Sequence, residues 1–190
     1  MGFSNPKAPS MAYHFEYDWF SPNIEVFEKH LAHLIGTPCQ TLEIGTHEGR
    51  STTWMLENIL TNPDARIVAI DLLQQPNLWD NLIESGQPFK VELRIGVSRE
   101  IVPTLPTNTF DFAYIDGSHW ACDVLEDAVL TFQRVKVGGI MAFDDYLWDD
   151  PTFNEHGTPK AAVDAFLTCY AHKLELLEKG YQVWVKKISD

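Results

Sequence analysis

The stretch TLEIGTHEGRST, residues 41–52, decides the fold, because a short β-rich run passes here through a glycine-containing turn into a helical pattern. Gly45 and Gly49 flank the turn, and glycine permits both a sharp strand-to-helix connection and a close approach of a ligand to the backbone. In open α/β sheets, ligands bind outside the carboxyl ends of the strands. The turn therefore predicts a ligand site at the end of the first strand.

The same alternation recurs along the chain, with each β-rich run followed by a helical pattern. The expected strands cover 40–44, 65–71, 91–95, 110–116 and 138–145, and the expected helices cover 50–60, 76–85, 98–103, 121–134 and 159–172. Such a series predicts a doubly wound, three-layer α/β fold, with a parallel sheet between two layers of helices. An opening helix is expected over about 21–35, and residues 173–187 are expected to add an antiparallel hairpin.

Composition limits the partners. The chain has 190 residues, with 14 Lys and Arg against 27 Asp and Glu, a net charge of −13. This charge repels phosphate, so we expect no nucleic acid and no membrane surface as a partner, and a small molecule instead. Three cysteines without a C-x-x-C pair, no long apolar stretch and no export-signal pattern predict a soluble, cytoplasmic protein.

Two acids at the ends of expected strands indicate a nucleoside-like ligand. Glu43 precedes the turn, where it would repel a dinucleotide pyrophosphate and suit a cationic ligand, and the turn lacks the G-x-G-x-x-G pattern. Asp71 ends the second expected strand, where a carboxylate can bind both hydroxyls of an adenosine ribose. The alternative for both residues is a capping or salt-bridging acid.

Three further acids follow the fourth and fifth expected strands: Asp116, Asp144 and Asp145. Clustered carboxylates repel one another unless a cation lies between them, and hard oxygen ligands suit Mg²⁺, Mn²⁺ or Ca²⁺. The alternative is that Asp116 alone lines the site and the other two belong to a solvated loop. His119 lies three residues beyond Asp116. Three roles are open to it: general base, metal ligand or surface cap.

Taken in order, TLEIGTHEGRST, IVAIDLL, FDFAYIDGSH, VKVGGIMAFDDY and the closing hairpin resemble the class I S-adenosylmethionine-dependent methyltransferases. The resemblance is closest to the small bacterial group related to the catechol and sugar or macrolide O-methyltransferases, and it covers about residues 38–187. It implies a Rossmann-like sheet of seven strands whose last strand is reversed.

The resemblance also implies roles for single residues. Glu43 and Gly45 would contact the methionine part of S-adenosylmethionine, Asp71 the ribose, and Val97 and Ser98 the adenine. The rest of the implied cofactor-binding set is Thr46, Gly49, Ser51, Leu72 and Asp116. The implied metal ligands are Asp116, Asp144 and Asp145, with Mg²⁺ as the expected ion, and the implied catalytic residues are His119, as the base, and Asp116.

The first hypothesis is metal-assisted O-methylation of a small acceptor with neighbouring hydroxyls. Residues 1–36 are expected to form a lid or dimer element, and residues 37–190 the methyltransferase domain. Because the chain leaves little length for an acceptor cap, a homo-oligomer is one way to complete the site. The rival hypotheses are a non-catalytic nucleotide-binding scaffold, an NAD-dependent oxidoreductase and a metal-only activity on the same fold.

Overall fold

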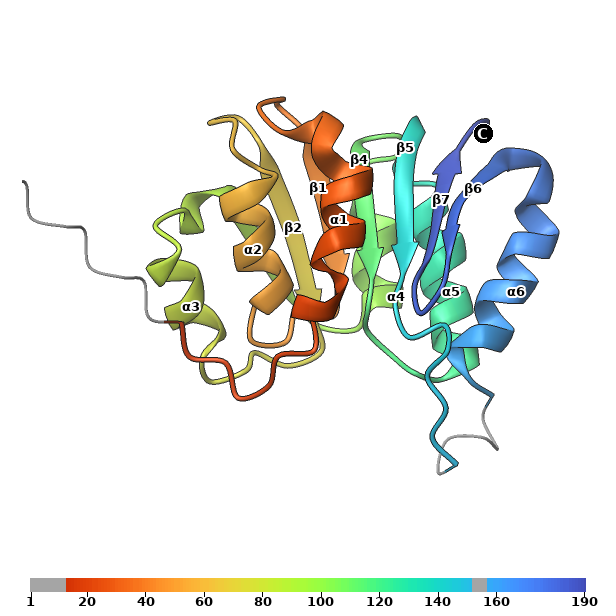
Figure 1. Ribbon diagram of the computed structural model, residues 1–190, viewed down its shortest axis with the longest axis horizontal. Coiled ribbons are helices and arrows are strands. Elements are labelled where there is room, and N and C mark those ends of the chain that lie inside the picture. The colour runs from red at the N-terminus through yellow and green to blue at the C-terminus, as the bar shows by residue number, and fades with distance from the viewer. Residues whose placement is uncertain (1–12, 152–156) are drawn as a thin grey trace, which may run out of the picture.

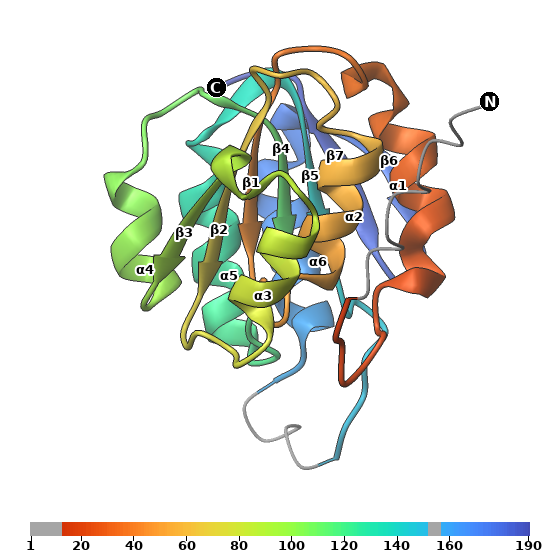
Figure 2. The same cartoon turned by 90° about the vertical axis from the view of Figure 1, so that its left-hand side faces the viewer.

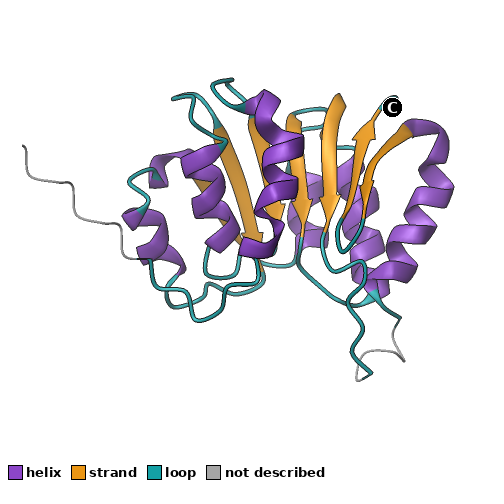
Figure 3. Cartoon of the chain, in the orientation of Figure 1, coloured by secondary structure: helices purple, strands orange, loops and turns teal. Residues whose placement is uncertain are grey.

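The computed structural model describes residues 13–151 and 157–190, and within these residues one seven-stranded sheet lies between two layers of helices (Figures 1 and 3). The strands are β1 (Gln40–Ile44), β2 (Arg66–Asp71), β3 (Val91–Ile95), β4 (Phe110–Ile115), β5 (Val135–Phe143), β6 (Leu174–Lys179) and β7 (Val183–Lys187). The helices are α1 (Ile24–Leu31), α2 (Arg50–Asn58), α3 (Leu78–Glu84), α4 (Ser98–Ile101), α5 (Ala121–Phe132) and α6 (Pro159–Tyr170).

The sheet has the order β3-β2-β1-β4-β5-β7-β6. The pairs among β1 to β5 are parallel, and β7 runs antiparallel to both β5 and β6. The predicted doubly wound sheet with a C-terminal antiparallel hairpin is therefore confirmed. The carboxyl ends of β1, β2, β4 and β5 meet along the lower edge of the sheet in Figure 1.

Two element boundaries differ from the prediction. β5 begins at Val135 rather than 138, because Val135 pairs with Phe110 before the register shifts between Phe110 and Phe112. A Cβ on Gly139 would lie 3.0 Å from the Phe110 carbonyl oxygen, so glycine permits this irregular pairing. The α-helix predicted over 98–103 ends at Ile101 and continues as a 3₁₀ turn, because Pro103 has no N–H to donate.

The side chains of each strand alternate between two cores. On β4, Ala113 and Ile115 belong to the core beneath α5 and α6, whereas Phe112 and Tyr114 belong to the core beneath α1, α2 and α3. Figure 2 shows α1 and α2 on one side of the sheet and α5 on the other. This alternation fixes the direction in which each strand-end residue points.

The opening helix is part of this packing. Phe27 of α1 is fully buried, and its ring meets those of Trp54, Tyr114 and Trp184 edge-on at centroid distances of 6.0, 5.0 and 4.9 Å. The 1–36 segment therefore shares its core with the rest of the chain, and residues 1–12 lie outside the described part. Its role as a lid or dimer element stays a prediction.

In the described ranges, no helix combines the length and apolar character needed to cross a lipid bilayer. Cys39, Cys122 and Cys169 are free thiols. The cytoplasmic location stays a prediction.

Candidate active site

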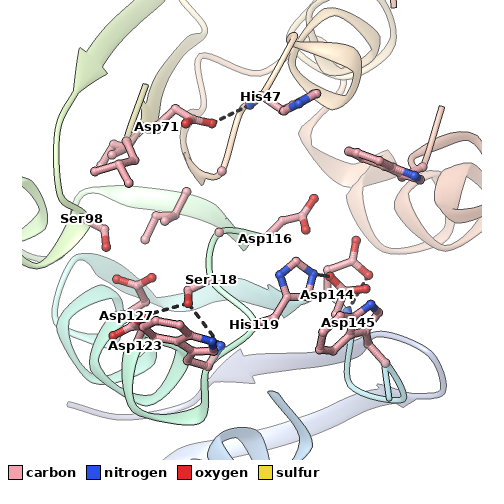
Figure 4. Close-up of a pocket in the computed structure, with 18 of the residues that line it drawn as sticks. His47, Asp71, Ser98, Asp116, Ser118, His119, Asp123, Asp127, Asp144 and Asp145 are labelled. Atoms are coloured by element: carbon pink, nitrogen blue, oxygen red, sulfur yellow. Dashed lines mark hydrogen bonds and ion pairs between the residues drawn. The ribbon is translucent and has the colours of Figure 1, made fainter. Parts of the chain in front are cut away.

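A cavity of about 1230 Å³ opens at the carboxyl ends of the parallel strands (Figure 4). It brings together most of the residues singled out in the sequence, from five separate loops. The predicted residues that line it are Gly45, Asp71, Leu72, Val97, Ser98, Asp116, His119, Asp144 and Asp145.

The loop after β1 lies tightly against the end of β4. Gly45 has a φ of 93°, and a Cβ at this position would lie only 1.9 Å from the carbonyl oxygen of Asp116. The Asp116 N–H donates to the Ile44 carbonyl at 2.8 Å, which extends the parallel ladder past the strand end. Glycine at position 45 is therefore required for the approach that forms the floor of the cavity.

Asp71 is held by backbone groups. One carboxylate oxygen, Oδ2, accepts the N–H of His47 at 2.7 Å, and Oδ1 accepts the N–H of Leu73 at 3.1 Å. His47 adopts a left-handed conformation, with a φ of 46°, which turns its N–H toward the acid. The Asp71 carboxylate is thus fixed at the cavity wall, and its contact with a ribose stays a prediction.

Four residues of the predicted cofactor set do not line the cavity: Glu43, Thr46, Gly49 and Ser51. Glu43 is fully buried and accepts hydrogen bonds from the hydroxyls of Ser51 and Thr52. Burial raises its pKa, and these hydroxyls oppose the shift. Because side chains alternate along β1, Glu43 points to the first turn of α2 while Ile44 faces the cavity. Glu43 therefore anchors α2 and does not line the cavity, and its contact with the methionine part of the cofactor stays a prediction.

The acids Asp116 and Asp144 lie at the ends of adjacent strands, above a buried tyrosine. The Tyr114 hydroxyl donates to Asp144 Oδ2, which also accepts the Asn23 side-chain amide at 3.3 Å. Burial raises the pKa of Asp116 well above its usual range, and the charges of Asp144 and Asp145 add to this effect. Burial also raises the pKa of Asp144, with Asp145 as the main charged contributor. The arrangement concentrates negative charge that a cation or a proton would relieve.

Asp145 and His119 form a pair at the same edge. His119 Nε2 lies 2.8 Å from Asp145 Oδ2, and the Tyr181 hydroxyl donates to Asp145 Oδ1 at 2.8 Å. The hydrogen bond to Asp145 raises the pKa of His119, while burial opposes the shift. Asp145 has a left-handed φ of 57°, which turns it back toward His119. An imidazole oriented by a carboxylate is an arrangement suited to general-base catalysis.

Within residues 13–151 and 157–190, no three His, Cys, Asp or Glu side chains are arranged to hold a metal ion. Asp116, Asp144 and Asp145 all line the cavity, but both Asp145 oxygens are engaged by His119 and Tyr181. The residue types fit a hard divalent ion, whereas the observed side-chain arrangement does not enclose one. The metal ligands therefore stay a prediction.

Aromatic side chains also line the cavity. Trp19, two-thirds exposed, stacks on Tyr17 with a centroid distance of 4.9 Å, and Trp148 lies 4.4 Å from the His119 ring. Trp19, Trp148 and Tyr181 all line the cavity.

Three other polar residues of the cavity were not predicted from the sequence: Asn23, Asp127 and Tyr181. Asn23 reaches Asp144 from 121 residues away, and Tyr181 lies in the turn of the C-terminal hairpin. Asp127 lies on the buried face of α5, and an acid within an apolar helical stripe is the one signal that could have identified it.

The sequence matches the family described as "Methyltransferase domain" over residues 42–146, more than half of the chain. The chain belongs to this family of methyltransferase domains. The match spans β1 to β5 and the loops that form the cavity floor, and it confirms the family predicted from the sequence.

Two curated relatives are O-methyltransferases. The catechol O-methyltransferase of Mycobacterium tuberculosis is 31% identical over 120 residues, which cover 56% of this chain and 53% of that protein. A caffeoyl-CoA O-methyltransferase of Pinus taeda is 30% identical over 122 residues, covering 57% of this chain and 43% of that protein. The chain thus spans about half the length of the curated relatives that it matches.

Solved structures share the fold. The O-methyltransferase TomG of Streptomyces achromogenes, solved in complex with SAM, has a TM-score of 0.71 at 21% identity, covering 95% of this chain and 83% of TomG. The MycE methyltransferase of the mycinamycin biosynthetic pathway, solved with Mg and SAH, has a TM-score of 0.66 at 18% identity, covering 92% of this chain and 51% of MycE. At these identities the likeness supports the fold.

Proposed function

We propose that this protein is an S-adenosylmethionine-dependent O-methyltransferase acting on a small hydroxylated acceptor. One observation carries the proposal: a single cavity is lined both by the nucleoside-type acid Asp71 and by the His119–Asp145 pair. Methyl transfer needs this combination, because donor and acceptor must be held together while the acceptor hydroxyl loses its proton. A scaffold would need only the first feature.

The end of the cavity lined by Gly45 and Asp71 is the nucleoside end. There, this chain supplies a carboxylate and a stretch of backbone that a ligand can approach closely. Asp71, fixed by the two backbone N–H groups, would accept hydrogen bonds from the ribose hydroxyls. The glycine at position 45 keeps the cavity floor free of a side chain. When bound, S-adenosylmethionine supplies an activated methyl group on a sulfonium.

One end of the cavity, the acidic end, is lined by Asp116, Asp144 and Asp145. At this end, His119 would accept the proton of the acceptor hydroxyl. Asp145 Oδ2 would stabilise the resulting imidazolium through Nε2, and Tyr181 holds the other oxygen of Asp145 in place. Oriented general bases of this kind contribute roughly 10²–10⁴-fold to a rate. Asp116 and Asp144 would favour positive charge nearby, including the sulfonium.

The donor chemistry of Asp116, Asp144 and Asp145 supports a divalent ion, with Mg²⁺ first among the candidates. Asp116, Asp144 and Asp145 would hold such an ion, and the ion would supply Lewis-acid activation of the acceptor hydroxyl. This role and the orientation of His119 both draw on Asp145, so metal dependence has to be measured separately from base catalysis.

The charge of the cavity favours acceptors without a negative charge. Among its described lining residues, Arg99 is the single Arg or Lys, set against the acids Asp18, Asp71, Asp116, Asp123, Glu126, Asp127, Asp144 and Asp145. Anionic acceptors would be repelled, whereas neutral or cationic ones would be tolerated. The aromatic rings of Trp19 and Trp148 suit a planar group.

A methyl-transfer assay tests the proposal. The protein is incubated with isotope-labelled S-adenosylmethionine and a panel of vicinal diols and catechols, with Mg²⁺ or with a chelator, and labelled products are measured by mass spectrometry. We expect a labelled methyl ether from at least one neutral acceptor. Absence of transfer across the panel, despite cofactor binding, would move the scaffold hypothesis to first place.

A double substitution tests the role of the metal ion separately. Replacing Asp144 and Asp145 together by Ala should abolish any stimulation by Mg²⁺, and Asp80→Ala, on the exposed face of α3, is the matched control. Unchanged turnover in the double variant would remove the metal from the proposal.

A further inference from the structure

One edge of the sheet, formed by β3, is open. β3 is the first strand in the order of the sheet, and within residues 13–151 and 157–190 it pairs with β2 alone. Figure 2 views the molecule from this end and shows β3 with α3 on one side and α4 on the other. Val91–Ile95 contains neither Pro nor Lys, residues that commonly block an edge strand. β3 is therefore able to accept a further strand.

The opposite edge of the described sheet, formed by β6, is less suited to pairing. The register of β6 with β7 shifts between Leu176 and Glu178, whereas β3 pairs with β2 without a shift. Glu178 is also held by Lys29 of α1, and Lys179 by Asp164 of α6 at 3.0 Å. Bulges and charged side chains both reduce pairing at an edge. β3 is thus the better candidate for an added strand.

The ladder to β2 determines which backbone groups of β3 point outward. The Gly96 N–H donates to the Asp71 carbonyl at 2.9 Å, so the backbone groups of Gly96 face β2. Because this direction alternates along a strand, the backbone groups of Arg94 and Glu92 also face β2. The residues whose N–H and C=O groups point away from the sheet are Val91, Leu93 and Ile95.

The sequence of β3 is complementary to itself when two copies run antiparallel. With Leu93 opposite the second copy's Leu93, Val91 lies opposite Ile95, and these pairs are hydrogen-bonded because their backbone groups point outward. Glu92 then lies opposite the second copy's Arg94 in a non-hydrogen-bonded pair, in which facing side chains come closest. Opposite charges at such positions stabilise an antiparallel pair, and two-fold symmetry forms this pair twice.

The charged and apolar side chains divide between the two faces of β3. Glu92 and Arg94 are exposed and form an ion pair within the chain, whereas Leu93 packs against the core beneath α3. Two antiparallel copies would place four charges of alternating sign side by side on one face. The charges that face each other across this edge are therefore complementary only to a second copy in this register.

Apolar side chains on α3 lie beside the same edge. Trp79 and Ile83, one turn apart, are about half exposed. They lie on the flank of α3 opposite Asn81, whose side-chain amide donates to the Glu48 carbonyl, in the loop after β1, at 2.9 Å. This flank therefore faces away from the centre of the sheet, toward the open edge. Exposed apolar side chains that gather in this way are typical of protein–protein contacts.

We propose that the chain forms a two-fold symmetric dimer in which β3 pairs antiparallel with β3 of a second copy, centred on Leu93, so that the two sheets become one continuous sheet. The pairing of Glu92 with Arg94 sets the register. Residues Val91–Ile95 do not line the cavity, so the inference does not depend on the proposed methyltransferase function.

Sedimentation equilibrium of the 190-residue chain tests the inference, with charge reversals at the two paired positions. Wild-type protein should show a monomer–dimer equilibrium. Arg94→Glu and Glu92→Arg each place like charges opposite one another twice, so each variant should dimerise at least about 10-fold more weakly. The two substitutions change the net charge in opposite directions, so general repulsion would not weaken both. Glu175→Arg, at an exposed position of β6, is the matched control and should dimerise like wild type.

A mixture of the two variants separates pairing from misfolding. Glu92→Arg in one chain and Arg94→Glu in the other restore two attractive pairs, so the mixture should form a heterodimer with about the wild-type affinity. Wild-type protein that stays monomeric up to about 100 μM would overturn the inference. Single variants that dimerise like wild type, or a mixture that forms no more dimer than its components, would overturn it as well.

Discussion

The two ends of the cavity are built in different ways. At the nucleoside end, Asp71 is fixed by backbone N–H groups 24 and 2 residues away in the chain. At the acidic end, side chains hold side chains: Asn23 contacts Asp144 across 121 residues, and Tyr181 contacts Asp145 across 36. Replacing a neighbouring side chain leaves the backbone donors to Asp71 in place. Replacing Asn23 or Tyr181, by contrast, removes a hydrogen-bond donor from Asp144 or Asp145. Substitutions at the nucleoside end should therefore change cofactor affinity, and substitutions at the acidic end should change turnover.

The largest effect is expected at His119. His119→Ala should lower kcat by roughly 10²–10⁴-fold, because it removes the oriented base, and should leave the affinity for S-adenosylhomocysteine within about twofold. Steady-state kinetics and calorimetry on the same preparation measure the two quantities. His33→Ala, an exposed histidine beyond α1, is the control. An unaltered kcat would assign His119 a structural role.

At the opposite end, Asp71→Ala should weaken binding of S-adenosylhomocysteine by roughly 100-fold, because hydrogen bonds to a charged group are lost. The kcat at saturating cofactor should fall much less. A loss confined to kcat, with affinity retained, would contradict the division between the two ends. Thermal unfolding of the ligand-free variant separates affinity from folding, since His47 and Leu73 lose their acceptor.

A third prediction concerns stability and pH. The pKa of Asp127 is raised from 3.8 to about 6, so its contribution to stability is fully present below pH 3.8 and is lost as the pH rises through 6. Between pH 4.5 and 7.5 this loss is about 2 kcal/mol. Asp127→Asn does not titrate, so its unfolding free energy relative to wild type should rise by this amount over the same interval.

Urea unfolding of ligand-free protein at several pH values measures this difference. A difference that stays constant with pH would show that Asp127 is not perturbed by its buried position. Gln133→Ala, at the exposed end of α5, is the control, because it removes no titrating group and its difference from wild type should stay constant with pH.

The smallest effect is expected at Tyr181. Tyr181→Phe removes one hydrogen bond to Asp145, and a single hydrogen bond contributes about 0.5–1.5 kcal/mol, so turnover should fall about 2- to 10-fold with cofactor affinity unchanged. Tyr170→Phe, which keeps its ring against Phe166 on α6, serves as the control. A change in cofactor affinity in Tyr181→Phe would show that the two ends are coupled.

The fold could be predicted from the sequence because each strand–helix unit is local. The alternation of β-rich runs and helical patterns gave the parallel sheet, and the reversed hairpin at 173–187 was recognisable on its own. The differences arose where local signals competed: Pro103 ends the α-helix early, and the register shift near Gly139 lets β5 start before the paired glycines.

The candidate site was predictable in part, for the same reason. Asp71, Asp116 and Asp144 end their strands, and parallel strands bring their ends together, so the sequence indicated that these acids share one cavity. The direction of Glu43 was harder to predict, because it depends on the phase of alternation along β1. The partners of the acids could not be predicted, since Asn23 and Tyr181 reach the cavity through tertiary packing.

The decisive experiment for the methyl-donor site is calorimetric titration of S-adenosylhomocysteine into the purified protein, with NAD as the comparison ligand. We expect one site per chain for S-adenosylhomocysteine, affinity lost in Asp71→Ala and retained in His119→Ala, and no binding of NAD. Binding of NAD, or no binding of S-adenosylhomocysteine by wild-type protein, would contradict this expectation.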